Sequence, residues 1–309
     1  MATVGSTTAA QSAPAAAPVE IQIRDARSYW RESLTRLSEN RIGMACGIFI
    51  LAMAVIALLA PVLAQLIHHD AYRQNLDNTF GPPSASNWLG TDELGRDTLT
   101  RLMFGAQVSL GIGFLAILLS LTVGASVGLA AGYFGGWIDE ILMRAVDILL
   151  SIPSIYLLIL MSSLPWFRGN VIYLAVLLAF IGWGGLARLV RGEVLSIKTR
   201  EFMIATKSVG AGDIRLMFRH LLPNALPVMI VSSTLGVGGI ILAEAALDFI
   251  GLGVQLPTPS WGNMLLNSQS YFYHSLWLVY IPGAMIVLTV LATNIFGNAL
   301  RDAFDPRLK

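Results

Sequence analysis

The stretch from Arg188 to Asn224 reads RLVRGEVLSIKTREFMIATKSVGAGDIRLMFRHLLPN and separates two long apolar runs. It carries seven basic residues, which are Arg188, Arg191, Lys198, Arg200, Lys207, Arg215 and Arg219. Positive charge that gathers beside membrane segments usually marks the cytoplasmic side. We therefore expect this stretch to be a cytoplasmic loop, and the rest of the chain can be oriented from it.

The local pattern of this loop predicts two short helices. Residues 202–209 have a helical pattern, which Gly210 and Gly212 interrupt. Asp213 can cap a second helix that runs toward Leu222. Two prolines then open the next apolar run, where a proline in the first helical turn costs little. A helix–glycine–helix unit suits docking to a soluble partner; the alternative is an amphipathic surface loop with no partner.

The composition places the chain in a membrane. Of its 309 residues, 55% are hydrophobic and only 13% are charged, against about 25% charged in a typical soluble domain. The apolar runs are long and do not alternate with polar residues, so the fold class is all-α integral membrane rather than β-barrel. The single cysteine, Cys46, lies in an apolar run and is expected to be a small packing residue.

Apolar runs of membrane length predict six transmembrane helices. They cover residues 42–67, 106–131, 141–164, 171–189, 226–247 and 276–300. Pro153 is expected to kink the third of them. The last five form one membrane core, residues 106–300, with the cytoplasmic loop at 190–224.

The remaining segments are polar or mixed. Residues 1–24 have the composition of a disordered tail, and residues 25–41 predict an amphipathic helix at the membrane surface. Residues 68–105 are expected to be external, residues 251–275 an external or re-entrant loop, and residues 301–309 a cytoplasmic tail.

The distribution of charge supports this arrangement. With both termini inside, only four of the 20 Lys and Arg residues fall in external segments, and these are Arg73, Arg96, Arg101 and Arg168. Such a bias over short loops fixes the orientation. We therefore expect a multi-pass membrane protein with both termini in the cytoplasm.

Small and charged residues in the spans suggest structural roles. Gly124, Gly128 and Gly132 recur every four residues and predict a smooth helix face for close packing in lipid. Arg144 and Asp147, three residues apart, can form an ion pair. Ser126 lies in a G-x-S-x-G pattern typical of serine hydrolases, but that pattern needs a strand–turn–helix context. Here it falls inside a glycine-rich helix, which argues against a hydrolase.

Glu244 and Asp248 are candidates for the translocation path. Glu244 is an acid within an apolar run, and Asp248 follows one turn later. A charge in the bilayer costs about 3 kcal/mol on insertion scales, so these side chains should face protein or water. Either they contact a transported solute, or they are interfacial acids that are paired or protonated.

No motif for catalysis or for a bound cofactor stands out. The chain has no phosphate-binding G-x-x-x-x-G-K-[ST] sequence, so no ATP site is expected in it. The tandem His68-His69 has no further ligand at suitable spacing, and we expect interfacial histidines rather than a metal site. We predict no catalytic residue, no metal and no cofactor in this chain, and no nucleic-acid partner.

Several motifs together resemble one family. Residues 205–206, Gly210 and residues 222–223 resemble the EAA loop of bacterial ABC-importer permeases, although Ile204 replaces the family's glutamate and Thr206 its second alanine. Further segments resemble the C-type permease subunits of dipeptide, oligopeptide and nickel importers (the DppC/OppC group). They are WLGTDELGRD at 88–97, AGYFGG at 131–136, MRAVD at 143–147, AALDFIGLGVQ at 245–255, PTPSWG at 257–262 and LRDAFDP at 300–306.

The resemblance implies a type I ABC importer permease of the MetI-like fold. Such a chain forms half of a pore for di- or oligopeptides or a related small solute. The implied partners are a B-type permease subunit, two cytoplasmic ATPases that bind ATP and Mg²⁺, and an external substrate-binding protein. The implied ATPase-coupling residues are Ala205, Thr206, Lys207, Gly210, Ala211, Asp213, Leu222 and Pro223. An ion-coupled secondary transporter or a channel is the alternative.

Overall fold

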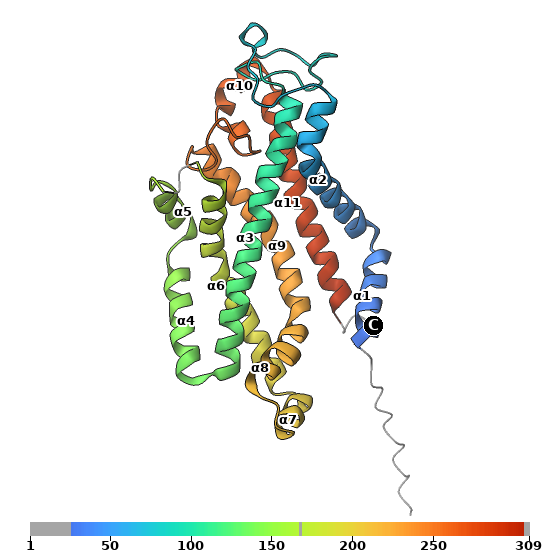
Figure 1. Ribbon diagram of the computed structural model, residues 1–309, viewed down its shortest axis with the longest axis vertical. Coiled ribbons are helices and arrows are strands. Elements are labelled where there is room, and N and C mark those ends of the chain that lie inside the picture. Colours follow the sequence, from blue (N-terminus) through green and yellow to red (C-terminus); the bar gives the residue numbers. More distant parts are fainter. Residues whose placement is uncertain (1–25, 167–168, 306–309) are drawn as a thin grey trace, which may run out of the picture.

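The computed structural model describes residues 26–166 and 169–305, and the described part is a bundle of long helices (Figure 1). The predicted tail at 1–24 and the last four residues lie outside it. The helices and shorter turns are α1 (Ala26–Glu39), α2 (Arg41–Leu66), η1 (Leu76–Asn78), α3 (Thr98–Phe134), α4 (Gly136–Ser151), α5 (Ser154–Ser162), α6 (Val171–Lys198), α7 (Glu201–Ser208), α8 (Asp213–Arg215), η2 (Leu216–Leu221), α9 (Leu222–Phe249), η3 (Asn263–Leu265), α10 (Ser268–His274) and α11 (Trp277–Phe304).

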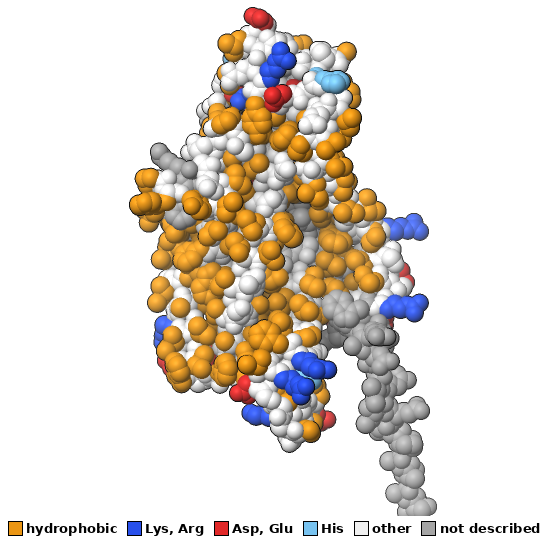
Figure 2. Space-filling model, viewed as in Figure 1, with side chains coloured by type: hydrophobic (Ala, Val, Ile, Leu, Met, Phe, Trp, Pro, Cys, Tyr) orange, Lys and Arg blue, Asp and Glu red, His pale blue; other side chains and the backbone are white. Residues whose placement is uncertain are grey.

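Five helices are long and apolar enough to cross a membrane on length and composition, within the described residues. They are α2, α3, α6, the continuous helix Asp213–Phe249, and α11. Figure 2 shows hydrophobic side chains around the middle of the molecule, whereas most charged groups gather toward its two ends. This distribution fits a bilayer around the bundle.

The predicted third span is a bent pair rather than one helix. Helices α4 and α5 meet at an angle of 80° at a break where Ile152 is extended and Pro153 follows. Proline disfavours helical geometry in the residue before it, so the bend at Pro153 has the expected cause. Figure 1 shows α4 starting beside the end of α3 and α6 starting near α5, so the pair carries the chain toward the opposite end of the bundle.

One predicted boundary is wrong. Helix α3 begins at Thr98 rather than at 106, because Asp97 caps it by accepting from the Thr100 backbone N–H at 2.8 Å. Its first turns are polar but buried under residues 68–97. A search for apolar runs in the sequence therefore does not detect them. The second helix of the loop at 190–224 runs toward Leu222 as expected and continues without a break into the fifth span.

Helices α3 and α6 form the centre of the bundle, and glycines let them approach. A Cβ atom on Gly124 would lie 2.7 Å from Leu186 Cβ, and one on Gly128 would lie 2.5 Å from the Ala187 carbonyl oxygen. Gly132 meets Val194 in the same way. Lipid tails are themselves apolar, so the burial of an apolar helix surface gains little free energy in a bilayer. Close packing of this kind is therefore a main source of helix association.

We predict that Gly128→Ala destabilises the protein by about 1–3 kcal/mol, because the new methyl group has no space against α6. The matched control is Gly111→Ala on the same helix, where nothing lies within 4 Å of the added Cβ. Thermal unfolding in detergent should show a lowered melting temperature for the first variant only. Equal melting temperatures would show that the α3–α6 contact is not tight.

Candidate functional site

The unit formed by α7, the turn 209–212, α8 and η2 projects from one end of the bundle (Figure 1). We call residues 201–222 the coupling element. Gly210 in its turn has φ +87°, a conformation that residues with a side chain rarely adopt. Gly212, two residues later, has an ordinary φ of −69°. The expected helix–glycine–helix shape is present, and only the first glycine is required by backbone geometry.

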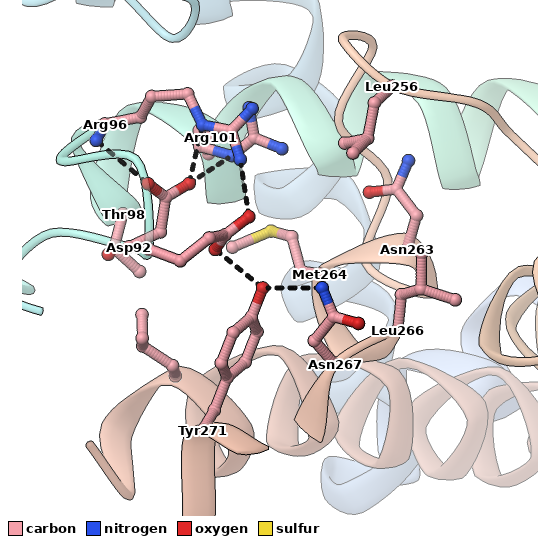
Figure 3. Close-up of a pocket in the computed structure, with 12 residues that line it drawn as sticks. Asp92, Arg96, Thr98, Arg101, Leu256, Asn263, Met264, Leu266, Asn267 and Tyr271 are labelled. Carbon is pink, nitrogen blue, oxygen red and sulfur yellow. Dashed lines mark hydrogen bonds and ion pairs between the residues drawn. The ribbon is translucent and has the colours of Figure 1, made fainter. Parts of the chain in front are cut away.

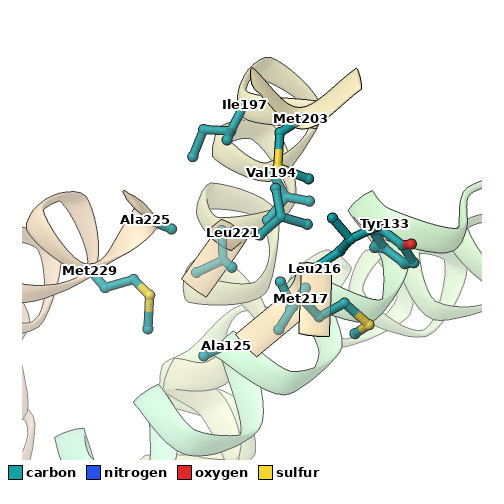
Figure 4. Packing of buried hydrophobic residues seen from close by; sticks show 12 residues of the cluster. Ala125, Tyr133, Val194, Ile197, Met203, Leu216, Met217, Leu221, Ala225 and Met229 are labelled. Carbon is teal, nitrogen blue, oxygen red and sulfur yellow. The ribbon is translucent and has the colours of Figure 1, made fainter. Parts of the chain in front are cut away.

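The inner face of the coupling element is held by a hydrophobic cluster (Figure 4). Met203 from α7 and Leu216 and Leu221 from η2 are almost fully buried. They belong to one cluster with Val194 and Ile197 of α6. Helix α6 and the start of α9 should therefore move together with the coupling element, because packed protein interiors resist deformation.

Polar contacts tie the coupling element to the end of α3. Tyr133 Oη donates a hydrogen bond of 2.5 Å to Asp213 Oδ1. Lys198 Nζ donates to the Tyr133 carbonyl and lies 5.6 Å from the centre of its ring. Asp213 was expected to cap its helix, but the N-cap is Gly212 and makes no side-chain cap. The Asp213 carboxylate binds Tyr133 instead.

The helix after this turn contains a π-helical segment, η2, directly before Pro223. A proline inside a helix has no N–H to donate to the preceding turn, and its ring clashes with the carbonyl group of the residue four positions earlier. A wider helical turn relieves this clash. Asn224 Nδ2 donates to the His220 carbonyl at 2.6 Å. The helix therefore passes through Pro223 without a break and joins the coupling element to α9.

The outer face of the coupling element exposes apolar side chains. Val209 is 89% exposed and Ile214 is 75% exposed, and Ile204 and Phe218 are also exposed. Basic side chains stand around them, namely Lys207, Arg215 and Arg219. Exposed apolar groups rimmed by charge are typical of a protein interaction site.

The predicted coupling residues divide between the two faces. Ala205, Lys207, Gly210, Asp213 and Pro223 are exposed. Ala211 and Leu222 pack against the hydrophobic cluster, and the Thr206 hydroxyl donates to the Phe202 carbonyl at 2.6 Å. The departure at Ile204 places an apolar side chain, 59% exposed, where the family has a carboxylate.

Ion pairs between helices strengthen the same end of the bundle. Arg191 of α6 binds Asp139 of α4 through two hydrogen bonds of 2.5 and 2.6 Å. Asp147 pairs with Arg188 at 2.5 Å. Asp147 was expected to pair with Arg144, its neighbour on the same helix, but the packing of α4 against α6 brings a distant arginine closer. Sequence spacing carries no signal for such contacts between residues 41 or 52 positions apart.

A second polar cluster lies at the opposite end of the bundle (Figure 3). Asp92 Oδ2 is 2.7 Å from Arg96 Nε and 3.3 Å from Arg101 Nε, and all three side chains are less than 10% exposed. Glu93 accepts from Arg96 at 3.1 Å and from the Tyr271 hydroxyl at 2.6 Å. We call these five residues the external cluster.

The external cluster joins two segments that are far apart in sequence. It links residues 92–101 to α10 and encloses a cavity of about 30 Å³, space for a water molecule. Burial raises the pKa of the Tyr271 hydroxyl, and its hydrogen bond to Glu93 acts in the same direction. The charge pattern of the sequence assigned Arg96 and Arg101 to the same side of the membrane but did not indicate their common partner Asp92.

Glu244 and Asp248 lie inside the subunit, at 0% and 1% exposure. The Ser109 hydroxyl donates to Glu244 Oε1 at 3.2 Å. Neither carboxyl group reaches the surface of this subunit. A role of Glu244 and Asp248 in the translocation path stays a prediction.

The remaining candidates form no reactive centre. Ser126 is exposed on α3, and its hydroxyl donates to the Thr122 carbonyl at 2.8 Å. His69 Nδ1 lies 3.5 Å from Asp97 Oδ2. Across the described residues, no group of three or more His, Cys, Asp or Glu side chains is placed to hold a metal ion.

Comparison with known proteins agrees with this geometry. Residues 124–309 match the family described as binding-protein-dependent transport system inner membrane component, and residues 28–83 match the N-terminal TM domain of oligopeptide transport permease C. Two curated relatives illustrate the similarity. The dipeptide transport system permease protein DppC of Alkalihalophilus pseudofirmus is 41% identical over 91% of both chains. The oligopeptide transport system permease protein OppC of Bacillus subtilis is 37% identical over 91% of both.

A solved structure shares the fold. An inward-facing MetNI methionine ABC transporter chain aligns with a TM-score of 0.52 and 22% identity, covering 66% of this chain and 97% of that chain. The alternative of a secondary transporter or channel does not fit these matches. The chain therefore belongs to the binding-protein-dependent inner membrane component family and is a multi-pass permease subunit of an ABC importer.

Proposed function

We propose that this chain forms half of the pore of an ATP-driven importer of di- or oligopeptides. The relatives named above, at 37% and 41% identity, are permeases of oligopeptide and dipeptide transport systems. A glutathione transport system permease of Pectobacterium atrosepticum is 36% identical, so the substrate class extends to small peptide-like solutes. The other half of the pore is a second permease chain, and an external binding protein delivers the solute.

The coupling element is the proposed contact with two cytoplasmic ATPase subunits, which bind ATP and Mg²⁺. The exposed outer face of the coupling element supports this assignment. There Val209 and Ile214 are exposed among basic side chains, outside the apolar middle of the bundle. Its rigid inner face would transfer a push from the ATPases into the bundle. The spans then move as packed bodies and change the side on which the pore opens.

This assignment requires the coupling element to face the cytoplasm. Figure 1 shows α1 and the end of α11 toward the same end of the bundle as α7 and α8, so both described termini would be cytoplasmic. The external cluster and α10 would then face outward.

We expect a cysteine at Lys207 to react with an impermeant maleimide only after the cells are opened, and a cysteine at Trp88 to react in intact cells. The native Cys46 is first replaced by alanine in both variants. Trp88 is 63% exposed and serves as the control on the other side. Labelling of the Lys207 position in intact cells would reverse the topology and remove the ATPase contact.

We expect Val209→Asp to weaken binding of the ATPase subunits at least about tenfold, because it places a charge in an apolar contact. Ser208→Asp is the matched control, since it adds the same charge at the neighbouring exposed position without removing apolar surface. The measurement is the ATPase-to-permease ratio after affinity purification of the complex. Equal ratios for both variants and the wild type would place the contact elsewhere.

We expect Gly210→Ala to lower peptide uptake several-fold, because a side chain in this backbone conformation costs about 1–2 kcal/mol and shifts the turn. Gly212→Ala has ordinary backbone geometry and open space around it, and should transport like the wild type. Uptake into proteoliposomes that contain the full complex measures both. Normal transport by the Gly210 variant would contradict a role for the shape of this turn.

A further inference from the structure

The outer end of α9 holds two carboxyl groups inside the protein. Glu244 and Asp248 are four residues apart on α9, where side chains of a helix are neighbours on one face, and both are buried. Among the described residues, no basic side chain forms a salt bridge with either. Two unpaired negative charges in such a site would be very costly, so at least one compensating proton is required.

Both carboxylate oxygens of Asp248 accept hydrogen bonds from the loop that follows α9. Its Oδ1 accepts from the Val254 backbone N–H at 2.5 Å, and its Oδ2 accepts from the Ser260 hydroxyl. The loop approaches so closely that a Cβ on Gly253 would overlap Asp248 Oδ1. A Cβ on Gly262 would lie 2.7 Å from the Asp248 side chain. Residues 253–262 are therefore wrapped around this carboxylate.

Glu244 connects the same loop to α3. The Ser109 hydroxyl donates to Glu244 Oε1 at 3.2 Å and accepts from the Trp261 backbone N–H at 3.2 Å. Trp261 is fully buried, and its indole N–H donates to the Leu102 carbonyl at 3.1 Å. Glu244 Oε2 accepts no hydrogen bond although it is buried. A proton on this oxygen would remove one of the two buried charges and would make it a hydrogen-bond donor, for which Asp248, one helical turn away, is the neighbouring acceptor.

We propose that Glu244 and Asp248 share one proton and act as a latch that fastens the outer end of α9 to α3 and to residues 253–262. Helix Asp213–Phe249 is continuous, so its other end is the coupling element. The latch passes movement of α9 to the external loop when the ATPases close. Glu244 is thus a positioning residue and does not touch the solute; this inference rests on the proposed function.

The test compares two substitutions at Glu244 in the complete importer. Glutamine has the shape of a protonated carboxyl group and can still donate a hydrogen bond to Asp248. Alanine removes the hydrogen-bonding groups that face Ser109 and Asp248. With dialanine as the probe, Glu244→Gln should keep uptake into proteoliposomes within about twofold of wild type, and Glu244→Ala should lower it at least about tenfold.

Equal loss in the glutamine and alanine variants would overturn the proposal, because it would show that a charged carboxylate is needed. Wild-type uptake in the alanine variant would overturn it as well. Ser109→Ala, which removes only the bridging hydroxyl, gives a milder variant if Glu244→Ala fails to assemble, and it should lower uptake several-fold with normal subunit stoichiometry.

Infrared spectroscopy of the purified complex tests the proton without transport. The proposal requires a protonated-carboxyl band at neutral pH that disappears in Glu244→Gln, and absence of that band in the wild type would disprove it. If the wild-type complex transported no peptide, the proposed function would fail, while the infrared band would still decide the state of the latch.

Discussion

The close approach of α3 and α6 is the constraint on which the rest of the bundle depends. Lipid tails are as apolar as the helix surfaces, so helices associate in a bilayer through shape and polar contacts rather than through exclusion of water. The glycines at 124, 128 and 132 provide that shape. Around this pair, α4 is held by the Asp139–Arg191 ion pair and α9 by contacts with both helices. The features at the two ends of the bundle therefore share one rigid support.

Continuity of the helix from Asp213 to Phe249 gives the two ends of the molecule a mechanical connection. Two prolines near its start could have separated the coupling element from the span, as the sequence suggests. The π-helical turn before Pro223 removes that break. The solvent-exposed coupling element thus lies at one end of a continuous helix, and the buried polar loop of residues 253–262 packs against the other end. The apolar, membrane-spanning part of the helix separates them.

Sequence patterns predicted the fold class, most of the spans and the helix–glycine–helix shape of residues 201–222, because apolar run length reflects the bilayer and glycines interrupt helices. They did not predict features that depend on tertiary contact. The start of α3 at Thr98 was missed because its polar turns are covered by residues from elsewhere. The partners of Asp147, Asp213 and Glu93 were missed because each lies on a different element.

The burial of Arg96 and Arg101 has a consequence for the conditions under which this end of the molecule keeps its shape. Mobile ions weaken attraction between charges that face water, but they penetrate poorly to pairs that are less than 10% exposed. The ion pairs that hold the shape of residues 92–101 should therefore be nearly insensitive to the salinity of the surrounding medium. This end of the molecule would then keep the same local structure in dilute and in concentrated surroundings.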